Sequence, residues 1–239
     1  MEAIKQVALL FCAATIEELS ALSPQYLKKE DFPNNIELFK AKKGPLTNNC
    51  LLSLTGVGPI NAALTMGINL SKNLNIDCVI NVGLAGAYDL ERTPLNSLCY
   101  IYKEIWPEYG LHDGNKITAR AFSHPLWAEK DIYDELNLDD FEMFAKKYRI
   151  NDEVIPCKSV TVSGVSASFS RARYMWDTYH AELENMEGFS VAYSCLRKNI
   201  KFIEIRCVSN KVGPRTKDEK DFPGALKTMS NILPILGLA

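Results

Sequence analysis

Two glutamates stand where a carboxylate could act on a bound substrate. Glu18 follows an apolar run and opens a helix, so its side chain could reach a cleft and serve as a general base. Acids in a first helical turn also favour the helix dipole, and Glu17 and Glu18 fit that simpler role. Glu187 enters an otherwise apolar helix, where a carboxylate is costly to bury without donors. The vicinal hydroxyls of a ribose would be such donors, and a helix N-cap is the competing interpretation.

A third polar group follows the last apolar run of the chain. Ser209 and Asn210 come where this run ends, and the cations near them are Arg206, Lys211 and Arg215. We expect the strand to stop here and its loop to point a side chain into a site, although Asn is also a common turn residue.

Two glycine-rich stretches follow earlier apolar runs. Thr55-Gly56-Val57-Gly58-Pro59 lacks the third glycine of a dinucleotide fingerprint, because Asn61 stands there. A tight strand-to-helix turn explains its glycines. The functional alternative is that a small substrate approaches the bare backbone, either here or at Gly83-Leu84-Ala85-Gly86.

The spacing of apolar residues predicts strands that alternate with helices. The expected strands are Val7–Ala14, Cys50–Leu54, Asp77–Val82, Lys158–Val162 and Lys201–Val208, and the expected helices are Pro59–Leu70, Gly188–Lys198 and Pro223–Leu236. This alternation indicates an α/β fold with a mainly parallel central sheet, in which ligands bind beyond the carboxyl ends of the strands. Gly110–Glu153 is less regular and is interpreted as an insertion, so that residues 1–239 form a single domain.

Composition excludes several classes of function. Lys and Arg number 27 against 29 Asp and Glu in 239 residues, so a nucleic-acid partner has no electrostatic support. The apolar run near the N-terminus is too short for a membrane span and lacks the form of a signal peptide, which predicts a cytoplasmic protein. Seven widely spaced cysteines predict reduced, mostly buried thiols, and three scattered histidines predict no metal site.

Together these stretches resemble the nucleoside phosphorylase/nucleosidase superfamily. The matching residues, in the family's order, are Ala14–Leu19, Thr55–Pro59, Asn81–Gly86, Met186–Gly188 and Ser209–Asn210. Within it, the chain is most similar to futalosine hydrolases, through Val160–Ser166, Glu204–Arg215 and Asp221–Leu226. The run Ser-Asn-Lys-Val-Gly-Pro-Arg, followed by a Pro-Gly-Ala helix start, is the most specific of these signals.

The resemblance implies a nucleoside phosphorylase-like fold, with a central sheet of mixed strand direction. It also implies an enzyme that hydrolyses the N-glycosidic bond of futalosine without a cofactor. It places Glu18 where related enzymes deprotonate the attacking water, and Glu187 where they bind the ribose hydroxyls beside Met186. The base would contact Asn210 and the segment from Ser163 through Gly164 and Val165 to Ser166. Ala85, Gly86 and Ser209 complete the implied binding residues.

One departure bears on the substrate. Methylthioadenosine/S-adenosylhomocysteine nucleosidases carry Ser-Asp where this chain has Ser209-Asn210, and their Asp can act as an acid toward adenine. An amide cannot protonate a base at neutral pH, but it can donate a hydrogen bond to O6 or N7 of a 6-oxopurine. Asn210 therefore favours a hypoxanthine leaving group.

Three alternatives stay open. The adenine-specific nucleosidase shares the implied fold. A purine nucleoside phosphorylase would need cations for phosphate, and Arg171, Arg173 and Arg206 keep it possible. A non-catalytic nucleoside-binding module would keep Glu187 without needing Glu18. The superfamily also implies a homo-oligomer, dimeric or larger.

Overall fold

The structure is a computed structural model of the chain. It describes residues 8–32, 38–72, 74–114, 116–138, 146, 154–214 and 216–238. Arg215, one of the cations noted near Asn210, lies outside the described residues, as do residues 139–145 and 147–153 of the expected insertion.

Strands and helices alternate along most of the chain. The strands are β1 (Ala8–Ala13), β2 (Leu38–Phe39), β3 (Cys50–Leu54), β4 (Ile76–Ala87), β5 (Leu98–Ile105), β6 (Leu111–His112), β7 (Ile117–Thr118), β8 (Glu135–Asn137), β9 (Val154–Thr161), β10 (Leu183–Asn185) and β11 (Lys201–Lys211). The α-helices are α1 (Ile16–Ala21), α2 (Pro59–Ser71), α4 (Phe169–Tyr179), α5 (Gly188–Arg197), α6 (Phe222–Met229) and α7 (Ile232–Ile235). Short 3-10 turns cover Lys29–Asp31, Pro45–Thr47, Arg120–Phe122, Ala128–Lys130 and Lys217–Glu219.

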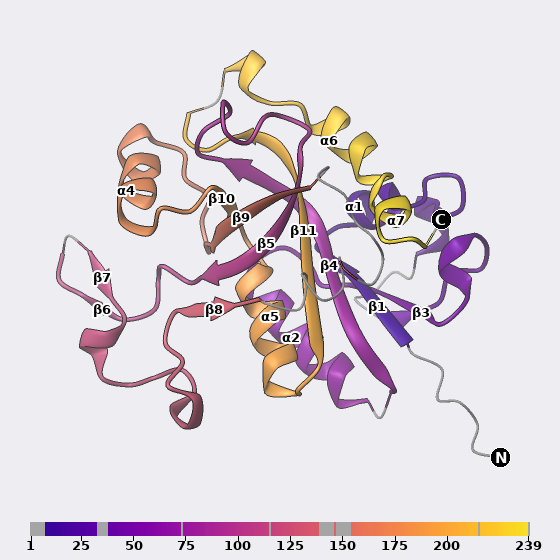
Figure 1. Cartoon of the computed structure of the whole chain (residues 1–239), viewed down its shortest axis with the longest axis horizontal. Coiled ribbons are helices and arrows are strands. Elements are labelled where there is room, and N and C mark those ends of the chain that lie inside the picture. Colours follow the sequence, from indigo (N-terminus) through magenta and orange to yellow (C-terminus); the bar gives the residue numbers. More distant parts are fainter. Residues whose placement is uncertain are drawn as a thin grey trace.

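The described strands other than β6 and β7 form a mixed sheet. Its order is β10-β9-β5-β11-β4-β1-β3-β2, with β8 added at β5 (Figure 1). The pairs β1–β3, β1–β4, β4–β11, β5–β9 and β9–β10 are parallel, whereas β5–β11 is antiparallel. Because β10 pairs with both β9 and β4, the strands β4, β11, β5, β9 and β10 close on themselves. The predicted α/β class with a mainly parallel, mixed sheet is confirmed.

Helices cover both faces of the sheet, as the alternation of side chains along β1 shows. Phe11 packs in a cluster with residues of α1, α6 and α7, including Leu19 and Met229. Leu10 packs on the opposite face, in a cluster that includes Met66 of α2 and Phe189 of α5. Neighbouring residues of a strand point to opposite faces, so a run that is apolar on both faces is buried on both.

Most expected elements are present, but two strands run further than the sequence predicts. We expected β4 to stop at Val82 and β11 at Val208, yet they continue to Ala87 and Lys211. The extensions pair with each other, from Arg206 opposite Gly83 to Lys211 opposite Ala87. Their backbone hydrogen bonds are satisfied by partners distant in sequence, so glycine and polar residues stay extended. Gly83–Gly86 is therefore part of β4, and the expected end of the strand at Val82 is wrong.

Other differences concern elements rather than their ends. The expected closing helix Pro223–Leu236 is two helices, α6 and α7, separated at Ser230 and Asn231. Pro234 has no N–H, so it fits only the first turn of a new helix. The strand β5, the helix α4 and the short strand β10 were not expected. All seven cysteines are buried, as predicted.

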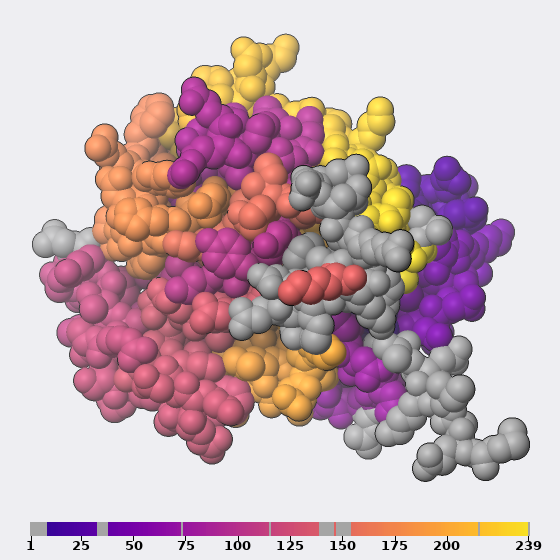
Figure 2. All heavy atoms as spheres, viewed as in Figure 1, coloured from indigo at the N-terminus to yellow at the C-terminus, as the bar shows by residue number. Residues whose placement is uncertain are grey.

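The described part of the expected insertion packs on α5 and joins the sheet at β5. β8 joins the sheet through β5, and the Tyr193 hydroxyl donates to the carbonyl of Leu126 at 2.9 Å. The guanidinium of Arg197 lies 4.8 Å from the ring centre of Trp127. In Figure 2 these residues, in rose tones, cover the lower left of the molecule below α4. The contacts of β8, Leu126 and Trp127 therefore attach this segment to the sheet and to α5.

Within the residues that the structure describes, no helix combines the length and apolar character that a membrane crossing requires.

Candidate active site

The loop between β1 and α1 fixes the carboxylate of Glu18. Thr15 is the helix N-cap, and its N–H and hydroxyl both donate to Oε2 of Glu18, at 3.0 and 2.9 Å. The other oxygen, Oε1, accepts from the N–H of Leu84 on β4 at 2.9 Å. Glu18 thus fills the helix-start role and also reaches a neighbouring strand. The carboxylate is buried and held from two sides, as a positioned general base requires.

The second carboxylate, Glu187, lies at the start of α5. It is the N-cap residue of α5 but makes no side-chain cap hydrogen bond. Its Oε1 instead accepts from the N–H of Gly58 at 2.9 Å. Gly58 and Gly56 have positive φ angles of 93° and 77°, so this is the glycine turn that the sequence predicts. The bare backbone of the turn therefore contacts the carboxylate of Glu187.

Burial raises the pKa of the Glu187 carboxyl above its ordinary value, while Arg206 and the Gly58 N–H act to lower it. The side chain is 5% exposed. Such a carboxylate lacks water to solvate it, so it gains from the hydroxyl donors of a bound sugar.

Arg206 connects the two carboxylates. Its Nη1 lies 3.7 Å from Oε2 of Glu187, and its Nε donates to Oε1 of Glu204 at 2.7 Å. A Cβ on Gly83 would stand 2.5 Å from Nη1 of Arg206 and 3.0 Å from Oε1 of Glu18. Burial acts to lower the pKa of Arg206, but Glu204 and Glu187 outweigh it and raise the pKa, so the guanidinium stays charged. Gly83 is needed because both side chains approach its backbone.

Asn210 is placed by an irregularity in β11. The pairing with β4 shifts between Val208, opposite Ala85, and Asn210, opposite Gly86. Ser209 is the extra residue, and its hydroxyl donates to the Ala85 carbonyl at 3.3 Å and to Oδ1 of Asn210 at 3.0 Å. A bulge re-aims the side chain that follows it. Ser209 and Asn210 thus belong to the strand, and the expected loop is wrong.

The amide of Asn210 is oriented by its neighbours. Its Nδ2 donates to the carbonyl of Lys211 at 2.8 Å and lies 3.0 Å from where a Cβ on Gly86 would stand. Since a primary amide has two N–H groups, one is left beyond the bond to Lys211. Glycine at position 86 allows this close approach.

The segment after β9 is held at both ends. The N–H of Ser163 donates to Oε2 of Glu108 at 3.0 Å, and the N–H of Ser166 donates to Oε1 of Glu184 at 2.8 Å. The Ser166 hydroxyl also donates to Glu184, at 2.6 Å. Of the four residues expected to meet a base, the exposed Gly164 and Val165 lie between these anchors. Met186 is half-buried and packs at the edge of a cluster containing Val162.

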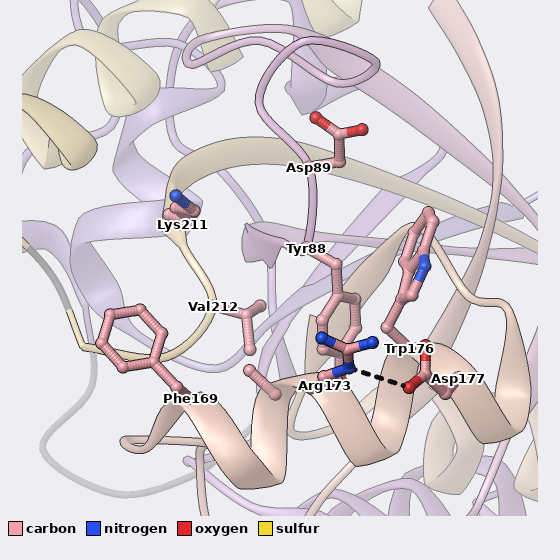
Figure 3. A pocket seen from close by; sticks show the side chains of 9 residues that line it. Tyr88, Asp89, Phe169, Arg173, Trp176, Asp177, Lys211 and Val212 are labelled. Atoms are coloured by element: carbon pink, nitrogen blue, oxygen red, sulfur yellow. Dashed lines mark hydrogen bonds and ion pairs between the residues drawn. The ribbon is translucent and has the colours of Figure 1, made fainter.

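A hollow of about 470 Å³ lies beyond the ends of β4 and β11. Figure 3 shows Tyr88, Trp176 and Phe169 around it, with Arg173 joined to Asp177 on α4. Val212 borders both this hollow and Gly86.

The three arginines considered for phosphate all have carboxylate partners. Arg171 pairs with Glu108 at 3.2 Å, Arg173 pairs with Asp177 at 3.3 Å, and the buried Arg206 pairs with Glu204. A phosphate would have to displace these acids, so the arrangement favours water over phosphate as the second reactant. Across the described residues, no three His, Cys, Asp or Glu side chains gather closely enough to hold a metal ion.

Sequence reasoning missed how Arg206 and Glu204 act. Arg206 was grouped with the cations near the strand end, and Glu204 was not singled out. The signal was available, because two charged residues spaced by two in an apolar strand must share one face and have to be paired there.

Comparison of the sequence with known proteins identifies its family. The profile of the Phosphorylase superfamily matches residues 8–233. The chain belongs to the Phosphorylase superfamily. A futalosine hydrolase from Thermus thermophilus is 26% identical over 196 residues, which are 82% of this chain and 84% of that protein.

Solved structures of superfamily members share the fold. A futalosine hydrolase mutant from Helicobacter pylori has a TM-score of 0.72 at 17% identity, covering 97% of this chain and 98% of its own. A 5′-methylthioadenosine/S-adenosylhomocysteine nucleosidase from Campylobacter jejuni also has a TM-score of 0.72, at 20% identity and 97% of both chains. Since the two scores are equal, the fold of this superfamily member does not distinguish the two substrates.

Gly83→Ala tests the convergence of Glu18 and Arg206. The added methyl would collide with both side chains, and displacing such groups lowers kcat/KM by about 100-fold. The measurement is nucleoside hydrolysis by the folded variant. Gly67→Ala is the matched control, because a Cβ there meets nothing within 4 Å, and in a helix it should stabilise by about 1 kcal/mol. Full activity of Gly83→Ala would contradict the geometry.

Proposed function

We propose that the protein hydrolyses the N-glycosidic bond of futalosine, releasing hypoxanthine and dehypoxanthine futalosine in menaquinone biosynthesis. The observation that carries the proposal is the pairing of two buried carboxylates, Glu18 and Glu187, around Arg206, with an amide rather than an acid at position 210. The futalosine hydrolase relative, alignable over most of both chains, supports the same substrate.

In the proposed reaction, Glu18 binds the attacking water and takes its proton. Oε2 accepts two hydrogen bonds from Thr15, whereas Oε1, beside Arg206, accepts one, from the N–H of Leu84, and is proposed as the oxygen that also faces the water. The sugar passes through an oxocarbenium-like state as the bond to the base breaks, and the oxygen of the water then bonds to its anomeric carbon.

Glu187 is proposed to hold the ribose. Its carboxylate would accept from the 2′- and 3′-hydroxyls, with Met186 packing beside the sugar. Positive charge develops on the ring in the transition state, and a buried carboxylate stabilises it more strongly there than in water.

Asn210 is proposed to receive the leaving base. One N–H of its amide is taken by Lys211, and the other would donate to O6 or N7 of hypoxanthine. Backbone groups of Gly164 and Val165, near Ser163, would bind the rest of the purine, with Ala85 and Gly86 lining the pocket. Negative charge on the departing base is then spread over donors that are already in place.

Base release in phosphate-free buffer tests the function. Futalosine, aminodeoxyfutalosine, methylthioadenosine and inosine are offered side by side and the products are separated by chromatography. We expect hypoxanthine from futalosine. Adenine from methylthioadenosine alone would contradict the substrate, and release only after phosphate is added would make the protein a phosphorylase.

Glu18→Gln extends this test to the mechanism. Loss of a general base should lower kcat by about 10²–10⁴. Substrate binding, measured by calorimetry, should be retained. Glu17→Gln is the matched control, because Glu17 is exposed and pairs with Lys29 at 3.2 Å. Binding of futalosine without turnover by the unmodified protein would instead indicate a nucleoside-binding module.

Asn210→Asp tests base selection. An aspartate can protonate adenine, and when ionised it repels the anionic hypoxanthine, so the ratio of kcat/KM for futalosine over methylthioadenosine should fall about tenfold or more. The measurement is the same base-release assay with both substrates. Asn199→Asp makes the same change on the exposed surface and should leave the ratio as it is. An unchanged ratio at position 210 would remove Asn210 from base recognition.

We further infer a cytoplasmic homo-oligomer, dimeric or larger. The outer face of α2 exposes Ile60, Leu64 and Ile68, which are 82%, 61% and 54% exposed at a spacing of four residues. A continuous apolar stripe of this kind suits burial against a second copy. Light scattering that gives the mass of a single chain at micromolar concentration would contradict the inference.

A further inference from the structure

Four glutamates are buried around a single guanidinium. Glu18, Glu104, Glu187 and Glu204 are 7%, 0%, 5% and 1% exposed, and Arg206 is 1% exposed. Unpaired carboxylates in a dry interior take up protons rather than stay charged. The proposed reaction uses Glu18 and Glu187, which leaves the roles of Glu104 and Glu204 to be explained.

Glu104 and Glu204 lie next to each other beneath the start of α5. A Cβ on Gly188 would stand 2.5 Å from Oε1 of Glu104 and also 2.5 Å from Oε1 of Glu204. Glu204 bonds directly to Arg206, whereas the described partners of Glu104 are neutral. The two acids are therefore close but unequal, because Glu204 alone of the two bonds to a cation.

Glu104 supports both side chains that hold the first turn of α5. Its oxygens lie 2.6 Å from Nδ2 of Asn185 and 2.7 Å from Oγ1 of Thr161. Oδ1 of Asn185 accepts from the N–H groups of Glu187 and Gly188, at 2.9 and 2.7 Å. Oγ1 of Thr161 accepts from the N–H of Phe189 at 2.8 Å. A chain of hydrogen bonds thus runs from Glu104 to the backbone of Glu187.

We propose that Glu104 is a positioning residue for Glu187, and that it carries the one proton of the Glu104–Glu204 pair. Protonated Glu104 accepts from Asn185 through one oxygen and donates to Thr161 through the other, and the Thr161 hydroxyl then donates to Oδ1 of Asn185, at 3.3 Å, in place of Glu104. Glu204 stays ionised as the partner of Arg206. The role given to Glu187 rests on the proposed function.

The electrostatic surroundings agree with this assignment. Burial raises the pKa of Glu104 well above its ordinary value, Glu204 raises it further, and Thr161, Arg206 and Asn185 act to lower it. Burial also raises the pKa of Glu204, but Arg206 opposes the shift. The other titratable groups facing the network are Glu187 at the start of α5, Glu18 of α1 and Cys12 of β1, whose thiol is buried and has a raised pKa.

Substitutions at Glu104 separate positioning from packing. Glu104→Ala removes the hydrogen bonds to Asn185 and Thr161, which hold the first turn of α5, and should lower kcat/KM by about 10- to 100-fold. KM should rise, because the carboxylate of Glu187 would shift away from the sugar. Glu104→Gln keeps one acceptor and one donor, as a protonated carboxyl does, and should recover most of that loss. Glu204→Gln removes the negative charge that pairs with Arg206, so it should lower kcat/KM more than Glu104→Gln does. Glu135→Gln, on the exposed neighbouring strand β8, is the matched control.

The pH profile and an infrared measurement report the proton directly. As pH rises through the raised pKa of the pair, the second carboxyl ionises and kcat/KM falls. Glu104→Gln has no such proton to lose, so this alkaline limb should move to higher pH or vanish. At neutral pH, the C=O stretch of a protonated carboxyl should be present in the unmodified protein and in Glu135→Gln, and absent in Glu104→Gln.

Three results would overturn the proposal. Glu104→Gln as impaired as Glu104→Ala would mean that Glu104 must be ionised. Equal losses in Glu104→Gln and Glu204→Gln, or no protonated carboxyl band at neutral pH, would remove the assignment of the proton. The assays use whichever nucleoside the protein hydrolyses, and the infrared band needs no substrate. A failure of futalosine as substrate is therefore distinguishable from a failure of this proposal.

Discussion

The buried guanidinium of Arg206 is the interaction on which the site depends. It lies on a central strand, is sealed from solvent, and is flanked by Glu204 and Glu187 with Glu18 close by. A buried arginine cannot shed its charge, so acids must surround it. The same constraint that makes the charge tolerable in the core therefore gathers carboxylates at one point. The proposed hydrolysis uses two of these carboxylates, so stability and chemistry share one set of contacts.

The strands around this point supply the polar side chains that the charge requires. One hydrogen-bond network, connected through Arg206, joins Asn81 of β4, Glu104 of β5, Thr161 of β9, Asn185 of β10 and Glu204 of β11. These strands are the ones that close on themselves through β10. Because each strand contributes, the network also fixes their register against one another. A precise position for the start of α5 follows from that register.

Selection of substrate within the superfamily is a more local matter. Solved futalosine hydrolase and methylthioadenosine nucleosidase structures match this chain equally well in fold. In the proposed function the base meets Asn210, the residue that the bulge at Ser209 positions. One scaffold can serve several substrates, and in the proposed function the residue after the bulge distinguishes the bases.

The sequence by itself determined the alternation of strands and helices, the turn at Gly56 and Gly58, and the positions of Glu18 and Glu187 at the starts of helices. These features depend on local periodicity and on backbone preferences, which short stretches contain. The tertiary structure decided that Gly83–Gly86 and Ser209–Asn210 are strand, since their hydrogen-bond partners lie more than a hundred residues away. It also decided that Arg206, Glu204 and Glu104 form one buried network. Pairing of charges depends on distances in space, and residues from β5, β9, β10 and β11 come together only when the sheet closes.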